Sequence, residues 1–131
     1  MSTEGPPETR SVVLVADDDR DILDLLAFRL GRAGYEVVSA SDGEEALRLA
    51  TERRPDLAVL DVMMPKLDGY EVTRRMRADE ATKRIPVILL TARVQEHDVA
   101  RGFEVGADDY MKKPFSPAEL RARVQTIIGR R

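Results

Sequence analysis

Acidic residues follow two apolar runs of this 131-residue chain and are the first candidates for chemistry. Asp17 and Asp18 come directly after residues 11–16, and Asp61 comes directly after residues 57–60. Short continuous apolar runs predict strands that are buried on both faces of a parallel sheet. If such strands bring the carboxylates together, one of them is driven toward protonation unless a cation lies between them. Mg²⁺ is the hard cation that prefers a shell of carboxylate, carbonyl and water oxygens.

Two further apolar runs end in groups that suit phosphoryl chemistry. Thr91 and Ala92 follow residues 86–90, and Lys113 follows the short run 108–112. A carboxylate held beside Mg²⁺ can attack a phosphoryl group, because this reaction depends mainly on positioning and charge neutralisation. The lysine would supply a point charge for the phosphoryl oxygens. The threonine would supply a hydroxyl donor, and the small alanine would leave the pocket open.

The elements that must position these groups alternate regularly. Strands are predicted at residues 11–16, 35–40, 57–60, 86–90 and 108–112, and a helical pattern follows each of them. This alternation predicts an α/β fold, a doubly wound parallel sheet with helices on both faces. Five strands fit the flavodoxin-like order 2-1-3-4-5 better than the six-stranded dinucleotide-binding fold. In that order strands one, three, four and five are neighbours, so their carboxyl ends converge on one crevice.

Local signals predict where the helices begin and end. Asp19 is a candidate N-cap, Asp42 precedes Glu45 at capping-box spacing, and Ser116 precedes Glu119 in the same way. Gly106 is expected to end a fourth helix over residues 95–104. The expected buried stripe of the first helix consists of Ile22, Leu23, Leu25, Leu26 and Leu30, with Gly31 and Gly34 as stop signals.

Composition limits the classes of function. Residues 1–10 lack apolar side chains to bury and are expected to be a disordered lead-in, followed by one domain over residues 11–131. Cysteine is absent, and neither a signal peptide nor a membrane span is recognisable, so a cytoplasmic location without membrane contact is expected. Twenty-one basic against 24 acidic residues give a net charge of −3, which argues against direct binding of nucleic acid. The basic run 74–77 is therefore interpreted as a solvated helix face.

Four segments in order resemble the receiver domains of bacterial two-component response regulators. They are Val-Leu-Val-Ala-Asp-Asp-Asp, Leu-Asp-Val-Met-Met-Pro-Lys-Leu-Asp-Gly, Leu-Leu-Thr-Ala, and Gly-Ala-Asp-Asp-Tyr-Met-Lys-Lys-Pro-Phe. The resemblance covers roughly residues 11–129. It implies that Asp61 is the phosphoacceptor and that Asp18 binds Mg²⁺ directly, Asp17 through water. It also implies that Met63 lends its backbone carbonyl to the metal.

The same resemblance implies a switch. Thr91 and Tyr110 match the pair whose side chains reorient when the aspartate is phosphorylated. Lys113 matches the lysine of the family, and the Lys113–Pro114 peptide bond would be cis. The implied function is a signalling switch that receives its phosphoryl group from a histidine kinase or a phosphotransfer protein. It would not be an enzyme beyond its own phosphoryl transfer and slow autodephosphorylation.

Residues 106–124 are similar to receivers of the winged-helix transcription-factor subfamily, which dimerise through the fourth helix, fifth strand and fifth helix. This likeness implies a weak homodimer that depends on phosphorylation. The expected cross-dimer ion pairs involve Arg101, Asp108, Asp109 and Arg123. The match departs at Val99, where that subfamily carries a basic residue.

Two alternatives from other classes are open at this point. A haloacid-dehalogenase-type phosphohydrolase would use Asp17 as nucleophile, because residues 17–19 fit an Asp-x-Asp motif after an apolar strand. That reading leaves Asp61 and Thr91 without a role. A receiver-like binding module that is never phosphorylated would keep the fold but lose part of the site, whereas every member of the site is present here.

Overall fold

Five parallel strands form the centre of the protein in a computed structural model that describes residues 10–92 and 96–129. They are β1 Val12–Ala16, β2 Glu36–Ala40, β3 Leu57–Asp61, β4 Val87–Thr91 and β5 Asp109–Lys112. The order β2-β1-β3-β4-β5 confirms the predicted flavodoxin-like topology. The predicted strands differ by one residue at several ends, and β4 continues through Thr91. Ala16 pairs with Leu60 and Asp61 with Leu90, so these strands end at the same edge.

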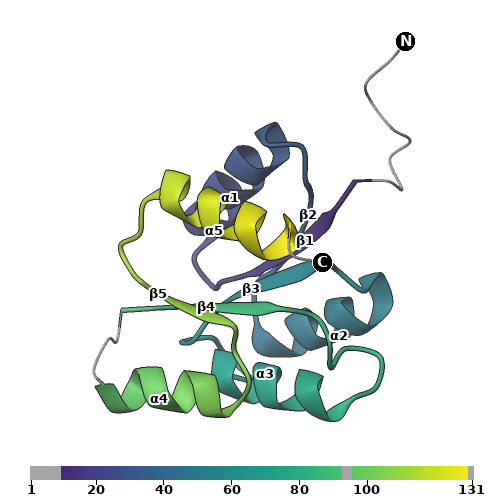
Figure 1. Cartoon of the computed structure of the whole chain (residues 1–131), viewed down its shortest axis with the longest axis vertical. Coiled ribbons are helices and arrows are strands. Elements are labelled where there is room, and N and C mark those ends of the chain that lie inside the picture. The colour runs from purple at the N-terminus through teal and green to yellow at the C-terminus, as the bar shows by residue number, and fades with distance from the viewer. Residues whose placement is uncertain (1–9, 93–95, 130–131) are drawn as a thin grey trace.

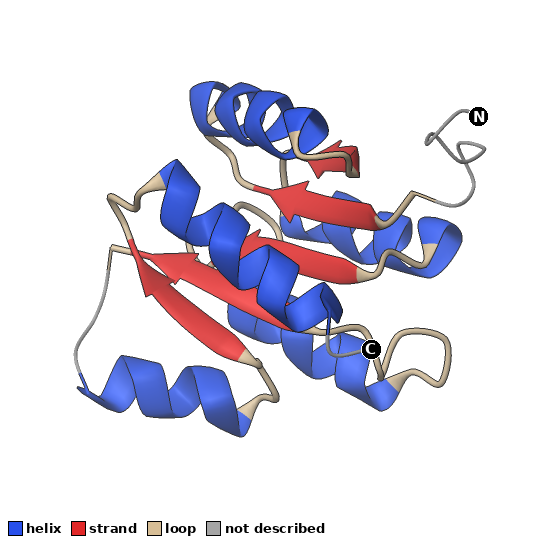
Figure 2. Cartoon of the chain, turned by 45° about the horizontal axis from the view of Figure 1, so that its top comes forward, coloured by secondary structure: helices blue, strands red, loops and turns tan. Residues whose placement is uncertain are grey.

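Helices cover both faces of the sheet, as predicted. Helices α1 Arg20–Arg32 and α5 Pro117–Gly129 lie on one face. Helices α2 Gly43–Arg53, α3 Gly69–Ala78 and α4 Glu96–Glu104 lie on the other (Figures 1 and 2). The predicted first residue of the fourth helix, Gln95, and the expected lead-in up to residue 9 lie outside the described residues. Within the described residues, no helix is long and apolar enough to span a membrane.

Strand β3 lies in the centre of the sheet, and all five of its residues are in the buried class, as are those of β4. Leu57 and Val59 pack in the cluster beneath α1 and α5, whereas Ala58 and Leu60 pack in the cluster on the opposite face. Successive side chains of a strand point to opposite faces, so a central strand between two helical layers must be apolar at every position. This explains why the sequence shows a continuous apolar run instead of alternation.

The predicted helix starts are confirmed by side-chain caps. Asp19 accepts the backbone N–H of Asp21 at 2.9 Å, and Asp42 accepts that of Glu45 at 2.8 Å. The Glu45 carboxylate in turn accepts the N–H of Ser41, one residue before the cap. The Ser116 hydroxyl accepts the N–H of Glu119 at 3.3 Å. Each cap satisfies an N–H that the first turn of a helix leaves without a partner.

Two expectations for α1 are wrong. Leu25 has 39% of its surface exposed, and the buried residues are Leu23, Leu26 and Leu30. Consecutive helical residues are rotated by about 100° around the helix axis. The sheet and α5 cover only one side of α1, and Leu25 lies outside that side. Gly31 lies inside the helix, which ends after Arg32. The break comes at Gly34, whose φ of +101° is a left-handed conformation that glycine adopts readily.

The expectation of a solvated face over residues 74–77 is wrong for Arg77. Its side chain is 24% exposed and donates to the carbonyl oxygens of Gly106 (3.0 Å), Lys83 (3.2 Å) and Ile85 (2.7 Å). It also pairs with Asp108 at 3.0 Å, and that carboxylate accepts the N–H of Val87. We call this set of contacts the Arg77 clamp. It ties the end of α3 to the turn between α4 and β5.

Candidate active site at the carboxyl edge of the sheet

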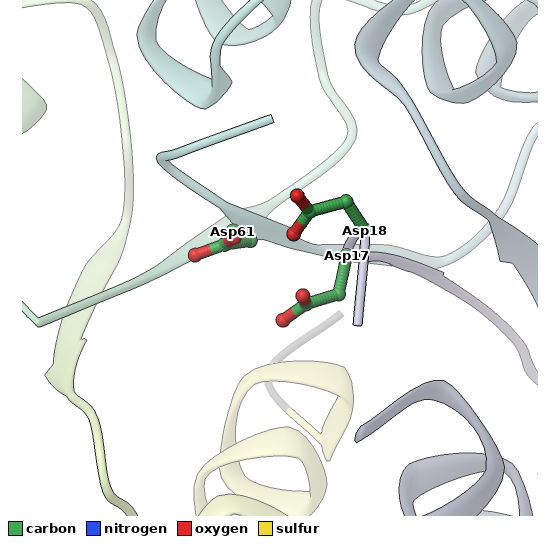
Figure 3. A group of neighbouring side chains, drawn as sticks. All are labelled: Asp17, Asp18 and Asp61. Atoms are coloured by element: carbon green, nitrogen blue, oxygen red, sulfur yellow. The ribbon is translucent and has the colours of Figure 1, made fainter. Parts of the chain in front are cut away.

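Three carboxylates meet where β1 and β3 end. Asp17 and Asp18 follow β1, Asp61 is the last residue of β3, and one oxygen of each lies within 4.8 Å of the others. Their side chains project to the same side of the sheet edge (Figure 3). Asp17 is 1% and Asp61 4% exposed, whereas Asp18 is open to solvent. The sequence prediction that these three residues converge is therefore confirmed in position.

Lys113 brings a positive charge into this cluster. Its Nζ lies 2.7 Å from Asp17 Oδ2 and 3.1 Å from Asp61 Oδ1. The lysine is positioned by its backbone, because its N–H donates to the carbonyl of Thr91 at 2.7 Å. The Lys113–Pro114 peptide bond is cis, as expected. Burial lowers the pKa of Lys113, but the bond to Asp17 and the charges of both carboxylates raise it by more, so the pKa is raised overall.

The pKa of Asp61 is raised to about 6. Burial is the largest cause and the charge of Asp17 the second, and these outweigh the lowering effects of Lys113 and of the Met63 N–H. Among the described residues, two buried carboxylates and an exposed one thus lie around the ammonium group of Lys113. An all-oxygen donor set with excess negative charge fits a hard divalent cation such as Mg²⁺, so the residues present are compatible with the metal predicted from sequence.

The loop after β3 carries Met63 past the cluster. The Met63 N–H bonds to Asp61, while its side chain is exposed. Gly69 closes the loop by donating its N–H to the carbonyl of Val62 at 2.9 Å. A Cβ at this glycine would lie 2.6 Å from the backbone oxygen of Asp61, so no larger residue fits without moving the strand end. The structure therefore puts the Met63 backbone at the site, and the metal-binding role of its carbonyl stays a prediction.

The two predicted switch residues lie on neighbouring strands. Thr91 is fully buried at the end of β4, one residue beyond Leu90, the register partner of Asp61. Tyr110 is half-buried on β5, and its ring lies against Gly102 of α4, where a Cβ would come within 2.9 Å of the ring. Asp61, Thr91 and Tyr110 thus occupy successive strands. Their reorientation on phosphorylation stays a prediction.

Sequence reasoning missed Tyr70, the second residue of α3. It is 4% exposed, and its hydroxyl donates to the Asp98 carbonyl of α4 at 3.1 Å. The same hydroxyl lies 3.2 Å from that of Tyr110, and the guanidinium of Arg101 lies 4.5 Å from the ring centre. Burial, and next the bond to Tyr110, raise its pKa above the ordinary tyrosine value. Its sequence position beside the Asp68-Gly69 turn gives no signal of these contacts with α4.

The four residues expected in cross-dimer ion pairs all have partners within the chain. Arg123 bonds to Asp109 at 2.8 Å and to Glu119 at 3.0 Å. Asp108 belongs to the Arg77 clamp, and Arg101 lies over the ring of Tyr70. A contact between two copies through these groups would have to exchange or share existing interactions.

Comparison with protein families gives one match that covers most of the chain. The model of the response regulator receiver domain matches residues 13–125. A curated relative is the alkaline phosphatase synthesis transcriptional regulatory protein PhoP of Bacillus subtilis, 52% identical over 118 residues. The alignment covers 90% of this chain and 48% of the relative, so the chain spans about half the length of such regulators.

Solved structures give the same result for the fold. The chemotaxis protein CheY4 of Vibrio cholerae has a TM-score of 0.86 at 34% identity, over 91% of this chain and 99% of that one. The receiver domain of the sensor histidine kinase PA1611 of Pseudomonas aeruginosa has a TM-score of 0.84 at 36% identity, over 92% and 99% of the two chains. That structure holds a magnesium ion in its active-site cleft.

Proposed function

Because this chain belongs to the family of response regulator receiver domains, we propose that it is a phosphorylation-activated signalling switch with Asp61 as its phosphoacceptor. The observation that carries the assignment is the environment of Asp61. Its carboxylate is buried at a strand end, 3.1 Å from Lys113 and within the acidic cluster. A buried carboxylate next to a cation and two further acids is a candidate for chemistry.

The proposed reaction is transfer of a phosphoryl group to a carboxylate oxygen of Asp61. An oxygen–phosphorus bond forms as the phosphorus leaves a histidine nitrogen of the donor, or the oxygen of a small acyl phosphate. Lys113 then transfers its hydrogen bond from Asp61 to a phosphoryl oxygen. Bound Mg²⁺, held by Asp17, Asp18, Asp61 and the Met63 carbonyl, would neutralise the carboxylates and the phosphoryl oxygens.

The proposed output is a change in the surface formed by α4, β5 and α5. The Thr91 hydroxyl would move toward the phosphoryl group, and Tyr110 would turn into the space that Thr91 vacates. Both residues lie beside α4, so this helix should respond first. A phosphoryl group can shift this equilibrium only by its differential interaction with the two arrangements, so the unmodified protein should also populate the active one slightly.

The proposed partners follow from the same chemistry. The phosphoryl donor would be a sensor histidine kinase or a phosphotransfer protein, and a second copy of the chain would bind weakly after phosphorylation. The PhoP relative is a transcriptional regulator of about twice the matched length. By analogy, we infer that the switch controls an output such as transcription through a region other than the one described here. Its catalysis would be limited to its own phosphorylation and slow autodephosphorylation.

The test is covalent labelling by acetyl phosphate with Mg²⁺, read by intact-protein mass. Wild type and Asp56→Asn should gain one phosphoryl group, and Asp61→Asn should gain none. Asp56 is a matched control, because it is a partly buried carboxylate just before β3, where it accepts the Val12 N–H at 2.7 Å. Chelation of Mg²⁺ should prevent labelling of wild type.

Other outcomes would assign the chain differently. Labelling that persists in Asp61→Asn but disappears in Asp17→Asn would favour the phosphohydrolase with Asp17 as nucleophile. A folded wild-type protein that takes no label from acetyl phosphate or from any histidine-phosphorylated donor would favour the unphosphorylated binding module.

A further inference from the structure

Tyr70 joins three elements through one side chain. It extends from the first turn of α3, donates to a backbone carbonyl near the start of α4, and pairs with the hydroxyl of Tyr110 on β5. With its hydroxyl hydrogen donated to Asp98, Tyr70 can still accept a hydrogen bond from the Tyr110 hydroxyl. The two phenols thus form a chain of hydrogen bonds that runs from β5 to α4.

The ring of Tyr70 and its hydroxyl have separable roles. The ring is buried in the cluster between the sheet and α2 and α3, and it supports the guanidinium of Arg101. A phenylalanine would preserve both of these contacts. Only the hydroxyl reaches Asp98 and Tyr110, so an account based on packing alone predicts no change in switching when the hydroxyl is removed.

We propose that Tyr70 is a positioning residue of the switch, whose hydroxyl holds Tyr110 and the start of α4 in the arrangement that accompanies an unmodified Asp61. The inference rests on the proposed function, because it assigns a restraint to the same switch. In the structure Lys113 pairs with the Asp61 carboxylate while Tyr110 pairs with Tyr70. Inward rotation of Tyr110 or displacement of α4 would break the bonds that Tyr70 makes.

The direction of the effect follows from this placement. Removing bonds that exist only in the unmodified arrangement shifts the equilibrium toward the active one. By linkage, a ligand that prefers the active arrangement then binds more tightly by the same factor. A net hydrogen bond between neutral groups changes an equilibrium by about three- to ten-fold, so Tyr70→Phe should tighten binding of an aspartyl-phosphate mimic by about that amount.

The probe is beryllofluoride with Mg²⁺, titrated into the 131-residue chain labelled with fluorotyrosine. The chain has three tyrosines, so fluorine resonances report Tyr35, Tyr70 and Tyr110 separately, and Tyr110→Phe identifies the last. In Tyr70→Phe without beryllofluoride, the Tyr110 resonance should move toward its beryllofluoride-bound position. Tyr35→Phe is the matched control, because it removes a phenol hydroxyl from the opposite face of the sheet. It should leave both the affinity and the Tyr110 resonance unchanged.

A double-mutant cycle isolates the pair of hydroxyls. In a Tyr110→Phe background, Tyr70→Phe should change the affinity less than it does in wild type, because part of the restraint has already been removed. Thermal unfolding of each variant shows that the fold is intact.

The proposal is overturned if Tyr70→Phe binds beryllofluoride as wild type does, or more weakly, or if the Tyr110 resonance does not move. Failure of the proposed function has a different signature, since wild type would then show no Asp61-dependent binding of beryllofluoride at all. In that case a Tyr110 resonance that stays at its wild-type position in Tyr70→Phe would still overturn the restraint.

Discussion

At the scale of single residues, the site holds Asp61 in an unfavourable electrostatic environment. Burial and Asp17 raise the pKa of Asp61 to about 6, although Lys113 lies within bonding distance. Such a carboxylate favours its own neutralisation, by a proton, a metal ion or a phosphoryl group on its oxygen. The buried negative charge thus favours the proposed reaction and destabilises the unmodified folded protein.

This cost predicts the stability of Asp61→Asn without metal. A carboxyl whose pKa is about 6 in the folded state, against an ordinary value of 3.8, destabilises the folded protein above pH 6. The amide removes this penalty, so the free energy of unfolding in a chelator at pH 7.5 should rise by about 1–3 kcal/mol. The gain should shrink as the pH falls through 6 and disappear near the unfolded-state pKa.

Urea titrations across this pH range would measure the effect, with the exposed Asp24→Asn on α1 as control. Saturating Mg²⁺ should reduce the gain, because it neutralises the same carboxylates. An Asp61→Asn protein that is less stable than wild type at pH 7.5 would show that the Lys113 pair outweighs the burial of the charge.

At the scale of elements, α3 does more than cover the sheet. Its first turn carries Tyr70 toward the start of α4, and its last turn carries Arg77 toward the turn that precedes β5. A guanidinium can serve several carbonyl oxygens at once because its donors form a rigid fork. The Arg77 clamp therefore fixes the turn between α4 and β5 through backbone carbonyl oxygens. A side-chain substitution at those positions does not remove these acceptors.

The clamp predicts a large effect of Arg77→Lys despite the preserved charge. A lysine can pair with Asp108 but cannot reach the Gly106, Lys83 and Ile85 carbonyls together, so the free energy of unfolding should fall by about 2–3 kcal/mol. The exposed Arg75→Lys, whose side chain bonds to Glu71, is the matched control and should cost well under 1 kcal/mol. Equal losses for the two variants in urea unfolding would rule out the clamp.

At the scale of the whole molecule, Asp109 and Arg123 on the proposed output surface already pair within the chain. Arg123 and Asp109 bond to each other at 2.8 Å, and exposed pairs of this kind contribute about 0.2–1 kcal/mol each. Exchanging them for equivalent pairs with a second copy therefore gains little. A dimer on this face should be weak, sensitive to salt and dependent on the change that phosphorylation makes.

Sedimentation with and without beryllofluoride tests this expectation. Wild type should associate only with beryllofluoride and Mg²⁺, less at high salt, and Arg123→Glu should prevent association by placing like charges together. Arg121→Glu, an exposed arginine on the same helix, is the control for net charge. Association of equal strength in both states, or association unaffected by Arg123→Glu, would move the output to another face.

The fold and the acidic site were predictable because their signals are local. Strand β3 shows its burial in four consecutive apolar residues, and parallel topology brings Asp17 and Asp61 to one edge without further information. Tyr70 and Arg77 carry no such signal. Their burial depends on where α4 and the following turn pack, which periodicity within α3 does not encode. The predicted burial of Leu25 was wrong for the same reason, since only the position of the sheet decides which leucines of α1 are covered.

The two ends of α4 are attached by bonds of different strength, and this asymmetry has a mechanical consequence. Near its start the helix is held by a neutral phenol at 3.1 Å, whereas beyond its end Gly106 is held by a guanidinium that also binds Asp108. Charge-assisted bonds are roughly twice as strong as neutral ones. The helix should therefore rotate about the Gly106 turn. Its displacement should be smallest at Glu104 and largest near Asp98, at the end that follows β4.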